Sequence, residues 1–150
     1  MGDVEQLHRK MGMTLIFLTA CVLAALIAWV DANADAQHIL AGHAINHADG
    51  LTERSVLGAV IVLSLWAVAK HYGATWWHLL GLALAFAATF SLVFRARLNK
   101  RRGLPLTYVS LSNVYDSVFI RLFGARAWIA AYTFEALVMA CGTIIYYLKP

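Results

Sequence analysis

The sequence predicts an all-α integral membrane protein, with four transmembrane helices and a short amphipathic helix between the third and the fourth. The 150 residues are 61% hydrophobic and only 13% charged, and their mean hydropathy is +0.68. This balance lies outside that of ordinary soluble domains. The apolar residues also gather into four blocks, each close to the roughly 20 helical residues that cross a hydrocarbon core. Segments of about ten residues with alternating polarity, as transmembrane strands require, are missing from the sequence.

The four blocks give the predicted helices in chain order, all within one transmembrane domain that covers residues 1–150. The first block, MTLIFLTACVLAALIAWV, contains no charged residue, and the last contains one carboxylate. Tryptophan and tyrosine residues stand at the block ends, where amphipathic rings prefer the headgroup zone. The predicted helices cover about residues 11–30, 54–72, 75–95 and 126–148.

The topology follows from the number of crossings and from the distribution of basic residues. Four crossings put both termini on one side and the loops 31–53 and 96–125 on the other. Eight of the twelve lysine and arginine residues fall within residues 31–54 and 95–126. By the positive-inside rule these two segments are expected to be cytoplasmic and both termini outside, in a bacterial inner membrane.

The two segments on the predicted cytoplasmic side differ in charge. Residues 31–54 carry a formal charge of −3 and residues 95–126 a formal charge of +6, so we expect them to attract each other. The remaining positive charge suits anionic lipid headgroups or an acidic partner. A solvated anchor that only fixes the topology is the simpler alternative. The residues expected to make these contacts are Arg95, Arg97, Lys100, Arg101 and Arg102.

An amphipathic helix is predicted over residues 112–123. Its apolar residues recur at helical spacing, while Asp116 and Arg121 lie off that stripe. Such a segment is typical of a helix in the membrane interface or of a docking surface for a partner. Tyr115, Phe119 and Phe123 are the contact residues we expect on it.

The stretch HILAGHAINHADG places three histidines between two apolar blocks. A short helix over about residues 34–48 would put His43 and His47 on one face, as two imidazoles must lie to bind one metal ion. Asp49 is a candidate further ligand. A pH sensor and a polar cap or partner surface are the alternatives for this stretch.

A haem site would use other histidines. His71 and His78 flank the turn between the second and third blocks, and two histidines can hold a haem iron. The alternative is that both simply lie at the membrane interface. Apart from these metal and haem hypotheses, no cofactor is expected.

Glu135 is the residue most out of place in the sequence. It lies eight residues into the last block, which is about 12 Å along a helix axis. A carboxylate at this position is costly in lipid and is expected to face other helices. It is a candidate proton or cation relay. The alternative is a protonated glutamic acid that hydrogen-bonds a polar residue of another helix, with the candidates Thr14, Thr19, Ser64, Thr89 and Ser91.

Small residues recur every four positions on two predicted helices, and this spacing allows helices to approach closely. The third helix carries Gly81, Ala85 and Thr89. The first carries an equivalent row, Ala20, Ala24 and Ala28. With two such faces on a short chain, we expect one of them to serve a neighbouring subunit.

These observations lead to three hypotheses of function. No catalytic motif is present, and the sequence holds no close pair of carboxylates within its predicted spans, so an enzyme is not expected. The leading hypothesis is a non-catalytic accessory or scaffold subunit of a larger membrane assembly. The alternative is a homo-oligomeric channel or proton- or cation-coupled transporter that uses Glu135. The third is a metal- or haem-binding membrane protein. The expected partners are lipid, other membrane subunits or further copies of the chain, and not nucleic acid.

Overall fold

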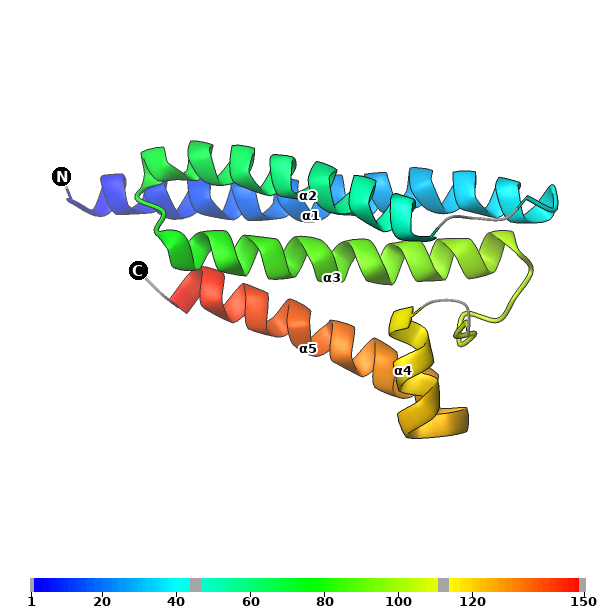
Figure 1. The fold of residues 1–150 in the computed structure, drawn as a ribbon. Coiled ribbons are helices and arrows are strands. Elements are labelled where there is room, and N and C mark those ends of the chain that lie inside the picture. The colour runs from blue at the N-terminus through cyan, green and yellow to red at the C-terminus, as the bar shows by residue number, and fades with distance from the viewer. Residues whose placement is uncertain (1, 44–46, 111–113, 149–150) are drawn as a thin grey trace.

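A computed structural model describes residues 2–43, 47–110 and 114–148. Within these ranges every regular element is a helix and none is a strand. The elements are listed in chain order: α1 (Gly2–Leu40), α2 (His47–Ala69), η1 (Lys70–Tyr72), α3 (Trp76–Arg101), α4 (Val114–Phe123), η2 (Gly124–Arg126) and α5 (Ala127–Leu148). The prediction of an all-helical chain with a short helix before the last long one is therefore confirmed (Figure 1).

Four stretches of this helical chain are long and apolar enough to cross a membrane. Three of them correspond to α1, α2 with η1, and α3. The fourth runs through α4, η2 and α5. The number of spans that the sequence predicts is thus matched by length and composition among the described residues.

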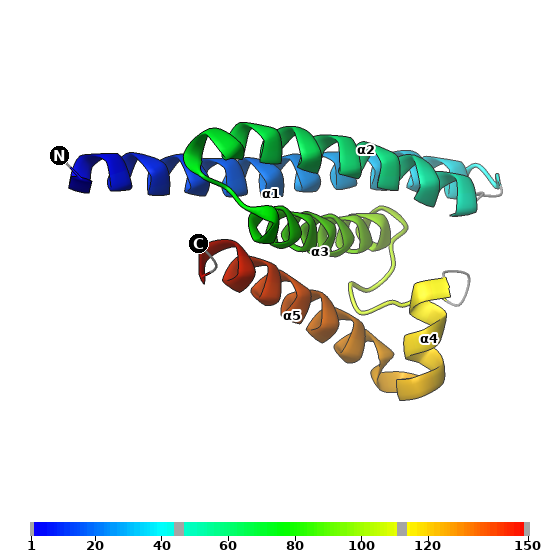
Figure 2. The ribbon, with the colours of Figure 1, turned by 60° about the vertical axis from the view of Figure 1, so that its left-hand side comes forward.

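The long helices run alternately in opposite directions, and α3 occupies the centre. Both termini and the α2–α3 turn lie at one end, which we call the terminal end (Figure 1). The end of α1, the start of α2 and α4 lie at the other, which we call the loop end. α3 packs against α1 on one side and against α5 on the other, while α2 makes fewer contacts (Figure 2).

Alanines line the face of α1 that is turned into the protein. They recur every four residues and are completely buried, and the row extends beyond the three predicted positions: Ala20, Ala24, Ala28, Ala32 and Ala36. Methyl side chains at this spacing let two helix backbones approach closely. Because α1 packs chiefly on α3, this row is used within the chain and is not left for a neighbour.

The crossing of α3 and α5 is closer still. A Cβ atom on Gly81 would lie 2.7 Å from the carbonyl oxygen of Gly142, and one on Gly142 would lie 2.8 Å from the backbone nitrogen of Ala85. Thr89 lies further along the same crossing, with its hydroxyl 4.0 Å from the Met139 sulfur. The three residues predicted to pack α3 therefore all lie toward α5.

α1 is longer than predicted and continues through residues 31–40, which we expected to form a loop and part of a separate helix. Two interactions stabilise the helix over residues 31–40. Ala32 and Ala36 continue the buried row, and Arg54 of α2 pairs with Asp31 and Asp35 at 3.2 and 2.7 Å. α1 then ends before Gly42, whose φ of 78° favours glycine. The predicted helix over residues 34–48 is therefore wrong.

α3 also runs past its predicted end, to Arg101 rather than to about residue 95. Its beginning is fixed by the α2–α3 turn, in which Gly73 has a φ of 83°. The Thr75 backbone N–H donates to Nδ1 of His78 at 2.9 Å, which uses a donor that the first helical turn leaves open. At the same end, Tyr146 of α5 is buried and donates to the carbonyl oxygen of Met13 in α1 at 2.7 Å.

Candidate functional site

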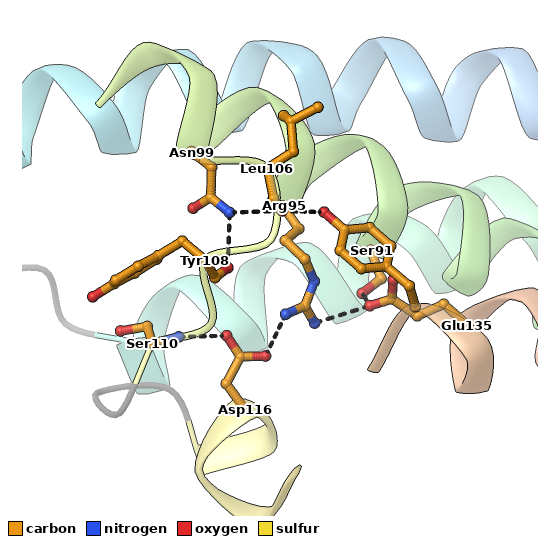
Figure 3. A network of polar contacts seen from close by, with 9 residues as sticks. Ser91, Arg95, Asn99, Leu106, Tyr108, Ser110, Asp116 and Glu135 are labelled. Carbon is orange, nitrogen blue, oxygen red and sulfur yellow. Dashed lines mark hydrogen bonds and ion pairs between the residues drawn. The ribbon is translucent and has the colours of Figure 1, made fainter. Parts of the chain in front are cut away.

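The strongest concentration of buried polar side chains lies at the loop end, where α3, α4 and α5 meet (Figure 3). We call Ser91, Arg95, Asn99, Asp116 and Glu135 the loop-end network. Four of its members are less than 9% exposed: Arg95, Asn99, Asp116 and Glu135. Polar groups buried to this extent require hydrogen-bond partners, and the network supplies most of them internally.

α3 contributes three residues at intervals of four, so that Ser91, Arg95 and Asn99 occupy one helix face. Arg95 is central because its two terminal nitrogens point to different helices. Nη1 donates to Oδ1 of Asp116 in α4 at 2.7 Å, and Nη2 donates to Oε1 of Glu135 in α5 at 3.0 Å. A single guanidinium thus fastens two helices to a third.

Glu135 is the most deeply buried charged residue described, with 2% of its surface exposed. Its Oε1 accepts a second hydrogen bond, from the Ser91 hydroxyl at 2.6 Å. Its Oε2 is buried and has no hydrogen-bond partner within the described part of the chain. The two oxygens of this carboxyl group are therefore in different environments.

Asp116 lies in the first turn of α4, where the helix dipole favours a negative charge. Its Oδ1 binds Arg95, and its Oδ2 accepts the backbone N–H of Ser110 at 3.0 Å. Asp116 consequently ties the start of α4 both to α3 and to the segment that precedes α4.

That segment, residues 102–110, is held by side chains from two helices. Asn99 of α3 donates to the carbonyl oxygen of Tyr108 at 2.9 Å and reaches that of Leu106 at 3.5 Å. The Tyr132 hydroxyl of α5 donates to the same Leu106 oxygen at 2.7 Å. The Arg95 guanidinium lies 5.6 Å from the centre of the Tyr132 ring. Leu106 and Tyr108 of this segment are thus held by side chains of α3 and α5.

The network joins two carboxylates that sequence spacing does not link. Asp116 and Glu135 are 19 positions apart in the sequence, yet both bind the same arginine. The cluster of one arginine and two carboxylates carries a formal charge of −1. Ion pairs this deeply buried lose hydration, and removing one partner leaves an uncompensated charge. The arrangement can therefore join helices, and it leaves Oε2 of Glu135 buried without a hydrogen bond to any described residue.

Arg95 was expected among exposed residues that contact lipid or a partner, and its burial corrects that expectation. Arg97 is half-buried, donating to Asn33 of α1 at 3.0 Å and lying 4.8 Å from the Trp29 ring. Lys100 and Arg101 are exposed. Arg102 is half-buried and lies 5.7 Å from the ring of Tyr108.

The predicted attraction between residues 31–54 and 95–126 takes another form. Asp31 and Asp35 pair with Arg54, which belongs to their own segment. The segments meet instead through the Arg97–Asn33 hydrogen bond. Arg54 also lies 4.6 Å from the ring of Phe94, which directly precedes the second segment. Salt bridges between the two segments do not occur among the described residues.

Of the three contact residues expected on α4, the structure describes the side chains of two. Phe119 stacks on Phe123 with ring centres 6.2 Å apart and approaches Phe134 of α5 at 5.9 Å. Phe123 is 51% exposed. The Tyr115 side chain lies outside the described residues.

The histidines do not form the arrangement that the metal hypothesis requires. His43 is exposed in the turn after α1, and His47 begins α2, so the two do not share a helix. The side chains of His47 and Asp49 lie outside the described residues. Elsewhere in the described ranges no three side chains of the metal-binding types come together. Of the two haem candidates, His78 is buried with Nδ1 bonded to Thr75, and His71 is exposed.

Comparisons of the chain with models of protein families, with curated proteins and with solved structures find no match.

Proposed function

We propose that the chain is an integral membrane protein, in a bacterial inner membrane, with its loop end in the cytoplasm. Four apolar helices support this proposal. So does the spacing of interfacial groups along α3, since Trp76 and Arg95 are 19 residues, or about 28 Å, apart in a straight helix. This span is close to the roughly 30 Å thickness of a hydrocarbon core. Arg95 then lies near one interface, and the basic residues at the loop end agree with a cytoplasmic location.

Within that membrane, we propose that the protein is a non-catalytic subunit of a larger assembly. The observation that carries the proposal is the second face of α1. Opposite the buried alanines, large apolar side chains recur every three or four residues along the helix and are all 47–76% exposed: Val4, Leu7, Met11, Leu15, Leu18, Val22, Leu26 and Trp29. Such a stripe is the pattern that helices use to pack against a partner helix.

The stripe continues beyond the part of α1 that lipid can cover. Val4, Leu7 and Met11 lie in a stretch that also contains Asp3, Glu5, Arg9 and Lys10, and charged residues of this density do not enter a hydrocarbon core. The beginning of α1 projects past the other helices at the terminal end (Figure 1). A helix of a partner subunit can cover the entire stripe, whereas lipid tails can cover only its membrane part.

The loop-end network agrees with this function. Arg95 of α3 binds both Asp116 of α4 and Glu135 of α5, and so connects the three helices. Their contacts lie within the chain, so these charges serve its architecture. The surface left for association is the apolar exterior of the helices.

The test is the mass and composition of the particle extracted in native nanodiscs. For a subunit, we expect other proteins to co-purify in fixed ratio. The double substitution Leu7→Glu with Met11→Glu places charges on the stripe outside the apolar span, and it should release those partners. Gln6→Glu, which adds a charge on the opposite face of the same turn, is the matched control. A particle that contains only lipid and one copy of this chain would contradict the proposal.

A second candidate function is favoured by Oε2 of Glu135, which is buried without a hydrogen bond among the described residues. We propose as the alternative a homo-oligomeric channel or a proton- or cation-coupled transporter that uses this oxygen. Intramembrane carboxylates commonly mark such pathways. Glu135→Gln preserves an oxygen that can accept from Ser91 and Arg95 but removes the ionisable group. In liposomes it should abolish flux for a relay, whereas a subunit should assemble unchanged.

A further inference from the structure

We propose that the corner formed by α4, η2 and the start of α5 binds anionic phospholipid headgroups. We call it the α4 corner and define it by Val118, Arg121, Leu122, Phe123, Arg126 and Trp128. The inference rests on the proposed location in a membrane. It adds that the protein binds anionic lipids of the cytoplasmic leaflet.

One side of α4 is occupied by the protein itself. Asp116 is buried against Arg95, and Phe119 approaches Phe134 of α5. These two anchors fix the rotation of the helix about its axis. They leave Val118 and Leu122, which are four residues apart, 48% and 69% exposed. Because Asp116 and Phe119 face the protein, Val118 and Leu122 lie on the exposed side of α4.

The direction of α4 suits a membrane surface. The long helices define the direction across the bilayer, and α4 runs across that direction at the loop end (Figures 1 and 2). A helix that lies in the plane of the interface places its apolar face among the upper acyl chains and its basic residues at the headgroups. Trp128, at the start of α5 and 37% exposed, adds an aromatic ring at the same level.

Arg121 and Arg126 give the corner its charge. Both are exposed, and neither forms a salt bridge to any described residue. Asp116, the acidic residue of α4, already pairs with Arg95, and so does Glu135 of α5. Glu53 is exposed on α2, but α2 has no contact with α4.

The combination of features selects the ligand. Two arginines without an acidic partner among the described residues favour a phosphate group with a net negative charge, and the adjacent exposed apolar side chains favour a phosphate that carries acyl chains. Phosphatidylglycerol has both properties, whereas phosphatidylcholine has no net charge and inorganic phosphate has no chains. An acidic segment of another protein would satisfy the arginines alone.

The test uses the full-length protein reconstituted in phosphatidylcholine bilayers that contain a small amount of spin-labelled lipid. The fraction of label immobilised by the protein is compared for phosphatidylglycerol and phosphatidylcholine. We expect a preference for phosphatidylglycerol that falls by up to about fivefold for each arginine replaced in Arg121→Gln and Arg126→Gln. Leu122→Asn should lower the preference too. Arg9→Gln with Lys10→Gln, at the terminal end, is the control and should leave it unchanged.

Three results would overturn the inference. They are equal immobilisation of the two lipids by the wild-type protein, a preference that survives in Arg121→Gln with Arg126→Gln, and a preference that millimolar inorganic phosphate abolishes. Loss of a co-purifying protein in the same double variant, without any lipid preference, would assign the corner to an acidic partner. Release of the protein from membranes at alkaline pH would instead reject the membrane proposal itself. The two failures are therefore distinguishable.

Discussion

Gly81 of α3 and Gly142 of α5 face each other so closely that a Cβ atom on either would lie 2.7–2.8 Å from the backbone of the opposite helix. Real Cβ atoms do not approach backbone atoms to this distance, so the two helices must separate if either glycine is replaced. The contact therefore sets the spacing between α3 and α5.

We predict that Gly142→Ala destabilises the protein by about 1–3 kcal/mol, the cost of inserting a methylene group into a filled contact. Gly50→Ala is the matched control, because its Cβ would meet only the Arg54 side chain, at 3.6 Å. This control should gain up to about 1 kcal/mol from the higher helix propensity of alanine. Thermal unfolding followed by circular dichroism gives both values. Equal effects of the two substitutions would refute the tight crossing.

Replacement of Arg95 should be far more damaging than replacement of Glu135. Arg95→Gln leaves Asp116 and Glu135 buried without their cation, at a cost of about 3–5 kcal/mol. Glu135→Gln retains the Arg95–Asp116 pair and an acceptor for Ser91, so it should cost much less. Unfolding midpoints of the two variants and protease cleavage within residues 102–110 provide the comparison. The network would have no structural role if Arg95→Gln were as stable as Glu135→Gln.

Asn99→Leu should release residues 102–110 without unfolding the bundle. The carbonyl oxygen of Tyr108 would lose its donor, and Leu106 would retain only the Tyr132 hydroxyl. Leaving a fully buried acceptor unsatisfied costs about 1–3 kcal/mol, and we expect a smaller cost at this part-buried site. Hydrogen exchange measured by mass spectrometry should become faster in this segment while α3 and α5 stay protected. Asn33→Leu, at a half-buried site that pairs with Arg97, should leave the segment unchanged.

Tyr146→Phe should weaken the contact between α5 and α1. It removes the hydroxyl that donates to Met13 at 2.7 Å but retains the ring, which lies 4.9 Å from that of Phe17. The expected loss is about 1 kcal/mol. Tyr147→Phe is the control at a neighbouring residue that is 47% exposed, and its effect should stay within about 0.5 kcal/mol. Similar losses in both variants would argue against the hydrogen bond.

Much of the fold could be predicted from the sequence because apolar length and small-residue spacing are local properties. The four long helices and the helix before the last of them follow from them. The prediction failed where charged residues continue a helix. The predicted first helix ends at about residue 30, before Asp31 and Asp35, yet Arg54, 23 and 19 residues away, pairs with these carboxylates within a continuous α1. A partner so distant cannot be identified from the spacing within one segment.

The candidate site was predicted only in part for the same reason. Glu135 stood out because it interrupts an apolar block, and Ser91 was among its expected partners. Arg95 was predicted to contact lipid headgroups or a partner because it begins the basic run RARLNKRR. One signal was present in the sequence, since Ser91, Arg95 and Asn99 recur at intervals of four and predict a polar helix face. The pairing of that face with Asp116 depends on the turn between α3 and α4, which spacing does not determine.

The order of residues in the loop-end network has a consequence for how the chain is made. Arg95 is synthesised before both of its carboxylates, and Glu135 follows it by 40 residues. At 5–20 residues per second the ribosome takes about 2–8 s to cover this interval. In the proposed membrane location, α3 must wait through that interval with its guanidinium held at the lipid interface. Only the emergence of α5 completes the charge pairing, so a helix translated after α3 fixes the final position of α3.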